Sequence, residues 1–229
     1  MPILARSEGT ERKTFMTGTL YFSRNPNPRL AVAVARHLRA PLTFEFAEPL
    51  APGQADRYRH LNPSLRLPIL AEGGDSLWEA DAIACRLSHQ QGSDFWRTGA
   101  DQADMVRWIS WARDHFMRAC DMVHFERGTK PRYGIGPLDE GVLAQGLALF
   151  RDSAAVLEAR LSQRPWLLTS GLSHADFRMA TFLPFNDVAK LPLSDYPAVA
   201  AWHQRLMALP AWADPFAGLT APELPPVPA

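Results

Sequence analysis

The sequence predicts an α+β unit over residues 17–91, followed by an all-helical unit over residues 100–219. Residues 42–46 alternate apolar Leu and Phe with Thr and Glu, which is typical of a strand with one buried face. Two short apolar runs flank a Gly-Gly-Asp turn at residues 73–75, which indicates a hairpin. Beyond residue 99 the apolar residues instead recur every three or four positions, as they do on a helix face.

The first unit is expected to contain its strands and helices in a βαβ-ββα order. The elements are a strand at 17–22, a helix at 29–39, strands at 42–46, 67–71 and 76–78, and a helix at 79–90. Pro28 introduces the first helix, where a missing N–H costs nothing because that group would have no partner inside the helix. A polar segment at 53–61 separates the second strand from the third. This element order is that of a thioredoxin-like domain.

The second unit is predicted to be a bundle of amphipathic helices. In residues 138–161 the apolar side chains form one stripe that faces a core. Residues 101–127 carry two stripes, an aliphatic one that starts at Met105 and an aromatic one that starts at Trp108. We therefore expect this helix to have apolar or aromatic partners on two sides.

Shorter signals place two further helices and the ends of the chain. Ser173-His-Ala-Asp176 is a capping-box pattern, so Asp176 is assigned a structural role, and residues 196–202 open a later helix. The remaining segments are an N-terminal extension at 1–16, a linker at 92–99 and a Pro-rich tail at 220–229. The tail is expected to be extended or mobile.

Charge and hydropathy exclude several classes of partner. The 24 Lys and Arg residues balance the 24 Asp and Glu residues, so no basic field attracts nucleic acid or anionic lipid. No apolar run approaches the length of a membrane-spanning helix, and the first fifteen residues are polar. We therefore expect a cytosolic protein with no nucleic-acid or membrane partner. Cys85 and Cys120 lie in apolar helical patterns and are expected to be reduced core thiols.

Several common chemistries have no motif in this sequence. Its seven histidines include no pair with a carboxylate at the spacing of a zinc protease. It also contains neither a Gly-x-Ser-x-Gly elbow nor a Gly-rich phosphate loop. The sequence thus predicts neither a metal site nor an organic cofactor.

Residues 62–87 carry the most informative pattern. Here Leu67-Pro68 precedes a strand, and Glu79 opens a helix after the hairpin. This pattern resembles the glutathione-binding half of the cytosolic glutathione S-transferases. The resemblance, which covers about residues 17–212, implies a cis Leu67–Pro68 bond and backbone pairing between Leu67 and the cysteine of glutathione. It also implies that Arg66 lies near the glycine end of that ligand.

In the family, an acid followed by Ser at this helix holds the γ-glutamyl end of glutathione. Glu79 matches the acid that receives the ammonium group, but the next residue is Ala80. The Ala80 amide still offers an N–H to the carboxylate at the helix N-terminus. The missing hydroxyl removes one hydrogen bond to a charged group, worth about 1.5–3 kcal/mol.

The family also stabilises the glutathione thiolate with a Tyr, Ser or Cys near the end of the first strand. In residues 21–28, Tyr-Phe-Ser-Arg-Asn-Pro-Asn-Pro, alignment with the Ser- and Cys-type relatives puts Pro26 or Asn27 in that position. The side-chain amide of Asn27 is the first candidate for the thiolate donor, and Ser23 is the second. Tyr21 and Asn25 stay open as alternatives. The loop contains no Cys, which argues against the subgroups that form mixed disulfides.

The resemblance implies a glutathione transferase that conjugates glutathione to a small apolar electrophile, acts as a homodimer and uses glutathione as its substrate. Trp111 and His115 are the candidates for the acceptor-substrate pocket. The alternative is a binding protein with the same fold that has lost catalysis and serves as a ligand carrier or protein-assembly module. Ala80 and the absence of a Ser or Cys in the usual position favour this alternative.

Overall fold

The computed structural model describes residues 18–228, so Thr17 of the expected first strand and the extension at 1–16 lie outside the described residues. The first part of the chain contains β1 (Gly18–Phe22), α1 (Pro26–His37), β2 (Leu42–Phe46), α2 (Ala55–Arg59), β3 (Ile69–Glu72), β4 (Asp75–Trp78) and α3 (Ala80–Gln90). This is the expected βαβ-ββα order, with one short helix, α2, in the polar segment at 53–61, for which the sequence analysis named no element. Helix α1 begins at Pro26, three residues earlier than predicted.

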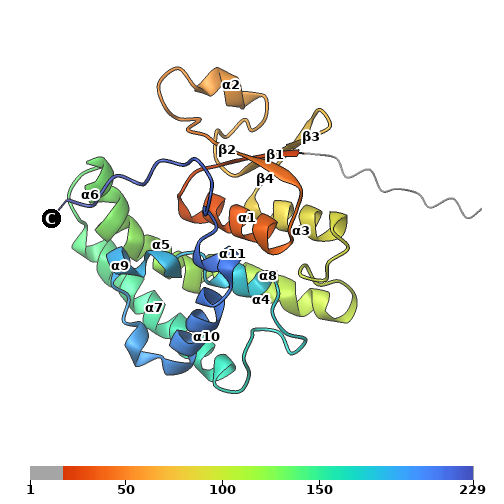
Figure 1. The fold of residues 1–229 in the computed structure, drawn as a ribbon. Helices are drawn as coiled ribbons and strands as arrows, with labels where there is room; N and C mark the ends of the chain where they lie inside the picture. The colour runs from red at the N-terminus through yellow and green to blue at the C-terminus, as the bar shows by residue number, and fades with distance from the viewer. Residues whose placement is uncertain (1–17, 229) are drawn as a thin grey trace, which may run out of the picture.

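The strands form one mixed sheet in the order β2-β1-β3-β4. Strand β1 is parallel to β2 and antiparallel to β3, and β3 is antiparallel to β4. Helices α1 and α3 lie on one side of the sheet and α2 on the other (Figure 1). Leu20 and Phe22 are buried, while Tyr21 lies on the α2 side, where its ring centroid is 5.7 Å from that of Tyr58. The alternation along β1 thus directs Tyr21 away from α1.

One edge of the sheet gathers the segments that the sequence analysis selected. Ile69 is the cross-strand partner of both Tyr21, near the end of β1, and Trp78, at the end of β4. The loop that enters α1, the Leu67–Pro68 segment and the start of α3 therefore lie at the same edge.

The rest of the chain is helical (Figure 1). Its elements are η1 (Gly99–Asp101), α4 (Gln102–Asp114), α5 (Phe116–His124), the π-helical turn η2 (Phe125–Thr129), α6 (Lys130–Tyr133), α7 (Glu140–Leu161), α8 (His174–Met179), η3 (Leu183–Phe185), α9 (Asn186–Ala189), η4 (Leu193–Asp195), α10 (Pro197–Met207) and α11 (Pro210–Ala213). The two parts together form the thioredoxin-like domain and the all-helical domain that the sequence predicts.

The single helix predicted over residues 101–127 is broken in the structure. His115, with φ −126° and ψ −94°, separates α4 from α5. Helix α4 packs on α8, whereas α5 packs on α7. The break lets the two halves of one apolar pattern face different partners, which a straight helix could not do.

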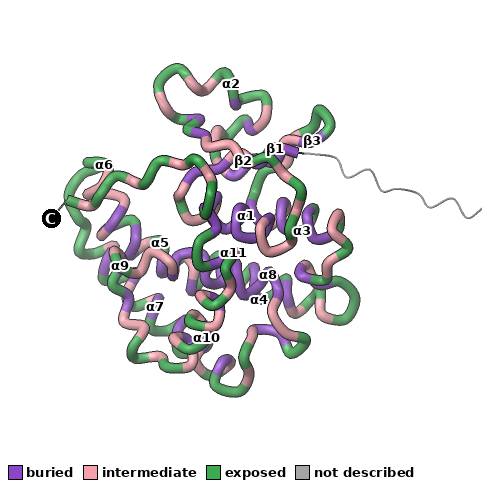
Figure 2. Tube along the Cα trace, in the orientation of Figure 1, coloured by how far each residue is buried: buried purple, intermediate pink, exposed green. Residues whose placement is uncertain are grey.

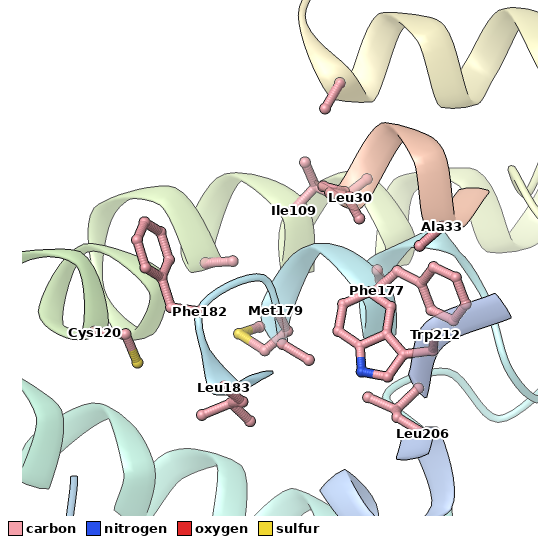
Figure 3. Packing of buried hydrophobic residues seen from close by; sticks show 14 of the residues in the cluster. Leu30, Ala33, Ile109, Cys120, Phe177, Met179, Phe182, Leu183, Leu206 and Trp212 are labelled. Carbon is pink, nitrogen blue, oxygen red and sulfur yellow. The ribbon is translucent and has the colours of Figure 1, made fainter. Parts of the chain in front are cut away.

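The core is continuous between the two parts of the chain. Figure 3 shows Leu30 of α1 beside Ile109 of α4, and Ala33 of α1 above Phe177 of α8 and Trp212 of α11. The longest buried stretches, purple in Figure 2, include α1 and α8 in the middle of the molecule. Burial of this apolar surface stabilises the arrangement of the two parts as well as each part itself.

Helix α8 is anchored by the capping box that the sequence predicted. The carboxylate of Asp176 accepts hydrogen bonds from the backbone N–H and hydroxyl of Ser173, at 3.0 and 3.3 Å. It also accepts from the Leu167 N–H and the Trp202 indole, both at 3.0 Å. Burial raises the pKa of Asp176 to about 6 in spite of these donors, so the group is ionised at neutral pH. The structural role predicted for Asp176 is confirmed.

Residues 220–228 of the Pro-rich tail contain no helix or strand, and they fold back over the molecule. The tail runs from α11 past the loop before α1 and on to α6 (Figure 1). Arg24 donates from Nε to the Ala221 carbonyl at 3.3 Å and forms an ion pair with Glu223 at 2.7 Å. Arg132 donates to the Pro225 carbonyl at 2.6 Å. The expected extended tail is therefore fastened to both parts of the chain.

Cys120 is buried and Cys85 is half-buried, and both thiols are free. Burial raises the pKa of both groups, which keeps them protonated and unreactive. Among residues 18–228, no helix is both long enough and apolar enough to span a membrane.

Candidate active site

A cavity of about 1020 Å³ lies at the sheet edge described above. Its walls are the loop at 23–28, residues 46–51 after β2, residues 65–67, parts of α5, η2 and α6, and the tail at 222–225. The cavity therefore has one wall from the thioredoxin-like part, one from the helical part and one from the tail.

The segment before β3 is shaped by Asn62, whose side chain is buried. Its amide nitrogen donates to the Arg66 carbonyl at 2.8 Å, and its oxygen accepts from the N–H and hydroxyl of Ser64 at 3.0 and 2.9 Å. These bonds hold the turn that leads to Leu67, and the Leu67–Pro68 bond is cis. Within residues 18–228, neither backbone polar group of Leu67 has a hydrogen bond to another residue. Leu67 can thus pair with an extended peptide as an added strand would.

Glu79 occupies the N-cap position of α3 and is exposed, with φ 74°. A positive φ is unusual for a residue with a side chain and is found most often at turns and functional sites. The Glu79 side chain caps none of the amides of α3, and Ala80 is buried beneath it. The first-turn N–H groups of α3 are thus free for an anionic group, with a carboxylate beside them for a cation. The cross-strand pair of Ile69 and Trp78 places this helix start beside Pro68.

The loop before α1 and the first turn of that helix hold the remaining candidates for thiol contact. Ser23 and Asn27 both line the cavity, as does the exposed Asn25. The Ser23 hydroxyl accepts a hydrogen bond from the Asn25 amide at 3.2 Å. Tyr21 is not among the residues that line this cavity, because it points to the opposite face of the sheet. The structure therefore favours the loop residues over Tyr21.

Asn27 is tied to the helical part by a polar network that the sequence did not reveal. Arg178 of α8 donates from Nη1 to Oδ1 of Asn27 at 2.6 Å, and its Nε lies 3.2 Å from Oδ2 of Asp81. The other Asp81 oxygen is 2.7 Å from Nε2 of His174, also on α8. Burial alone would raise the pKa of Asp81, but the hydrogen bond and charge of His174 and the charge of Arg178 lower it. Asp81 is thus held as a carboxylate at the junction of α1, α3 and α8.

Trp111 and His115, the residues predicted for the acceptor pocket, lie elsewhere. Their rings stack on each other with centroids 5.1 Å apart, and neither lines this cavity. The broken helix explains the difference, because His115 sits at the break and the cavity wall begins only in α5. The residues that form this wall are Met117, Asp121, His124, Thr129, Tyr133, Ile135 and Phe182.

A helical pattern could have identified part of this wall. Met117, Asp121 and His124 are spaced by four and three residues, so they share one face of α5. His124 is buried against Phe182 and Phe185, and its burial and the nearby charge of Arg132 lower its pKa to about 4. The wall therefore presents a neutral imidazole at neutral pH. Burial also raises the pKa of Asp121.

Comparisons with known proteins find similarity to glutathione S-transferases. A family model described as "Glutathione S-transferase, C-terminal domain" matches residues 140–205. The chain is 27% identical to the probable glutathione S-transferase GSTF2 of Oryza sativa subsp. japonica, over 80% of this chain and 85% of the relative. It is 24% identical to the disulfide-bond oxidoreductase YfcG of Escherichia coli (strain K12), over 84% of this chain and 91% of the relative.

A solved structure shows the same fold at lower sequence identity. Glutathione S-transferase I from maize, in complex with an atrazine glutathione conjugate, superposes with a TM-score of 0.80. The two proteins are 22% identical, and the match covers 88% of this chain and 97% of the maize chain.

Proposed function

Because the chain belongs to the glutathione S-transferase family, we propose that it binds glutathione at the sheet edge and conjugates it to a small apolar electrophile. The observation that carries this proposal is that three groups lie at one edge of the sheet, two of them, Leu67 and Asn27, in the cavity lining and the third beside Pro68. These are the unpaired backbone of Leu67, the N-terminus of α3 with Glu79, and the side chain of Asn27.

Each end of glutathione has a partner in this arrangement. The backbone of Leu67 pairs with the cysteine residue, and Glu79 accepts the γ-glutamyl ammonium group. The free amides of the first turn of α3 hold the γ-glutamyl carboxylate, and the exposed Arg66 is available to the glycine carboxylate.

The chemical step needs the thiol as a thiolate, and a free thiol has a pKa of about 8.5. In our proposal the Asn27 amide donates a hydrogen bond to the sulfur and so favours the anion, while the proton passes to solvent. The sulfur then attacks the electrophilic carbon, a carbon–sulfur bond forms and the leaving group departs with its electron pair. Binding both reactants in one cavity supplies proximity, and this mechanism requires neither a metal nor an organic cofactor.

The acceptor would lie against the wall formed by Met117, Phe182, Tyr133 and Ile135. These four side chains are apolar or aromatic, and the neutral His124 beside them adds no charge. The same wall contains one carboxyl group, Asp121, whose pKa is raised by burial. This composition supports an apolar acceptor and a role in detoxification.

Two measurements test the proposal. Isothermal titration calorimetry with glutathione measures binding, and the absorbance of the product of an activated aromatic chloride measures conjugation. We expect the folded protein to bind glutathione and to form the conjugate faster than the uncatalysed reaction. If the folded protein does not bind glutathione, the proposal is wrong.

Two variants separate binding from catalysis. Glu79→Ala should raise the KM for glutathione strongly, because the ammonium group loses its carboxylate partner. Asn27→Ala should mainly lower kcat, because the Asn27 amide acts on the sulfur. If Asn27→Ala has the kcat of the unmodified protein, the donor role moves to Ser23.

A binding protein without catalysis is the second candidate function. It is supported by Ala80, which offers no hydroxyl to the ligand, and by the start of α1, where prolines occupy two of the first three helical positions. Tight glutathione binding with no conjugation of any of several activated chlorides and epoxides would favour a ligand carrier or assembly module.

The family relationship also supports a homodimer located in the cytoplasm. Sedimentation equilibrium of the purified chain measures the first of these expectations. A mass of one chain at micromolar concentration would contradict it.

A further inference from the structure

We propose that Arg178 is a positioning residue that fixes the side chain of Asn27 with its NH₂ group toward the cavity. This inference rests on the proposed function, in which that NH₂ group donates to the glutathione thiolate. It adds a residue from the helical part, distant in sequence from the loop before α1, to the machinery that sets the thiol pKa.

The chemistry of the two side chains fixes the orientation of the amide. A guanidinium group has hydrogen-bond donors and no acceptor, so only the oxygen of an Asn side chain can face it. Arg178 Nη1 lies 2.6 Å from Asn27 Oδ1, and Asn27 lines the cavity. With its oxygen occupied by Arg178, the amide turns its NH₂ group to the other side. An unsupported Asn side chain could present either the oxygen or the NH₂ group.

Arg178 is itself held rigidly. Its side chain is 3% exposed, and its guanidinium forms an ion pair with Asp81 at 3.2 Å. The other carboxylate oxygen of Asp81 lies 2.7 Å from Nε2 of His174, which is on the same helix as Arg178. The capping box of Asp176 anchors that helix in the core. Contacts from α8 and, through Arg178, from α3 therefore set the orientation of Asn27 in the first turn of α1.

The start of α1 explains why this support matters. Helix N-termini stabilise anions through free backbone N–H groups, but Pro26 and Pro28 have none. The N–H of Arg29 is bonded to the Asn25 carbonyl at 2.9 Å. Asn27 is thus the one residue of the first three in α1 that can donate from its backbone. A second donor on its side chain compensates for the two missing amides.

Asn27→Asp gives the sharpest test, because it keeps an oxygen for Arg178 and replaces the NH₂ group with a negative oxygen. The thiolate absorbance of bound glutathione, followed against pH, reports the thiol pKa. We expect the pKa to rise by about one unit or more. The midpoint of thermal unfolding of Asn27→Asp should not fall below that of the unmodified protein. Its Kd for S-methylglutathione, which has no thiol, should change less than about twofold. Asn25→Asp adds the same charge to the loop without a contact to Arg178, and should raise the thiol pKa less.

A double-mutant cycle tests the role of Arg178 directly. Arg178→Met should raise the thiol pKa in the unmodified protein but not in an Asn27→Ala background, because its effect passes through that amide. An equal rise in both backgrounds, or an unchanged thiol pKa in Asn27→Asp, would overturn the inference. If Arg178→Met does not fold, the Asn27→Asp result decides alone. Failure of the folded unmodified protein to bind S-methylglutathione would instead reject the proposed function.

Discussion

Arg24 and Glu223, almost two hundred positions apart in the sequence, form an ion pair at 2.7 Å that fastens the tail beside the loop before α1. The Arg24 guanidinium also lies 4.8 Å from the ring centroid of Phe216, at the base of the tail. Phe216 in turn stacks on Phe22 of β1 with centroids 5.6 Å apart. The tail that follows is one wall of the cavity, so its position helps to define the space open to an acceptor.

Removal of residues 220–229 should therefore widen the cavity without disturbing the glutathione contacts. We expect the KM for a small aromatic acceptor to rise several-fold and the KM for glutathione to stay within about twofold, since no group proposed to hold glutathione belongs to the tail. Initial-rate kinetics with each substrate varied in turn measures both values. Equal rises in the two KM values would show that the tail supports the whole site.

The ion pair alone should contribute little to that effect. The Glu223 side chain is 80% exposed, and exposed ion pairs contribute about 0–1 kcal/mol. Glu223→Gln, used beside the truncation, should thus leave the acceptor KM nearly unchanged, because the carbonyl contacts of Arg24 and Arg132 remain.

A serine at position 80 should restore the missing carboxylate donor. Ala80→Ser places a hydroxyl in the first turn of α3, where one hydrogen bond to a charged group is worth about 1.5–3 kcal/mol. We expect the Kd for glutathione to fall about tenfold or more. Calorimetric titration gives the Kd, and Ala82→Ser, two residues further along the same helix, is the matched control. Equal affinity in Ala80→Ser and the unmodified protein would mean that the γ-glutamyl carboxylate does not bind at this turn.

The features predicted correctly from the sequence are those that depend on local patterns. The alternation in β2, the turn before β4 and the capping box of Ser173 and Asp176 each involve residues within a few positions. The break at His115 has no such signal, because apolar residues continue on both sides of it and only the packing on α8 and α7 separates α4 from α5.

The candidate site shows the same difference between residues in a local motif and residues joined by long-range contacts. The Leu67–Pro68 segment and Glu79 lie in one short stretch whose pattern is informative on its own. The contact between Asn27 and Arg178 joins residues that are 151 positions apart in the sequence. No motif next to either residue predicts that the two side chains meet. The tail enters the cavity wall for the same reason, through contacts that exist only in the folded chain.

Stability should fall in mild acid because of His124. Burial lowers its pKa to about 4, whereas an unfolded His has a pKa of about 6.5. Between these two pH values the unfolded chain binds a proton that the folded chain does not. The contribution of the neutral His124 to the free energy of unfolding, present above pH 6.5, is therefore lost as the pH falls toward 4. His124→Gln should flatten this part of the profile of unfolding free energy against pH. Urea denaturation at several pH values measures it, with His60→Gln, an exposed imidazole, as control. The prediction fails if His124→Gln and the unmodified protein show the same slope.

Replacement of the buried Asp176 should be among the most damaging single changes in the described chain. Its two oxygens accept from the Leu167 and Ser173 N–H groups, the Ser173 hydroxyl and the Trp202 indole. Asp176→Asn puts an NH₂ group in place of one oxygen, so that donors face donors at a fully buried position. We expect a loss of about 3 kcal/mol or more in the free energy of unfolding, measured by urea denaturation at pH 7. Asp152→Asn, an exposed position on α7, should change it by less than about 0.5 kcal/mol.

Because α8 carries Arg178, the folded fraction of Asp176→Asn should also bind glutathione with a raised thiol pKa. A stable Asp176→Asn protein with an unchanged thiol pKa would show that the capping box does not control the position of α8.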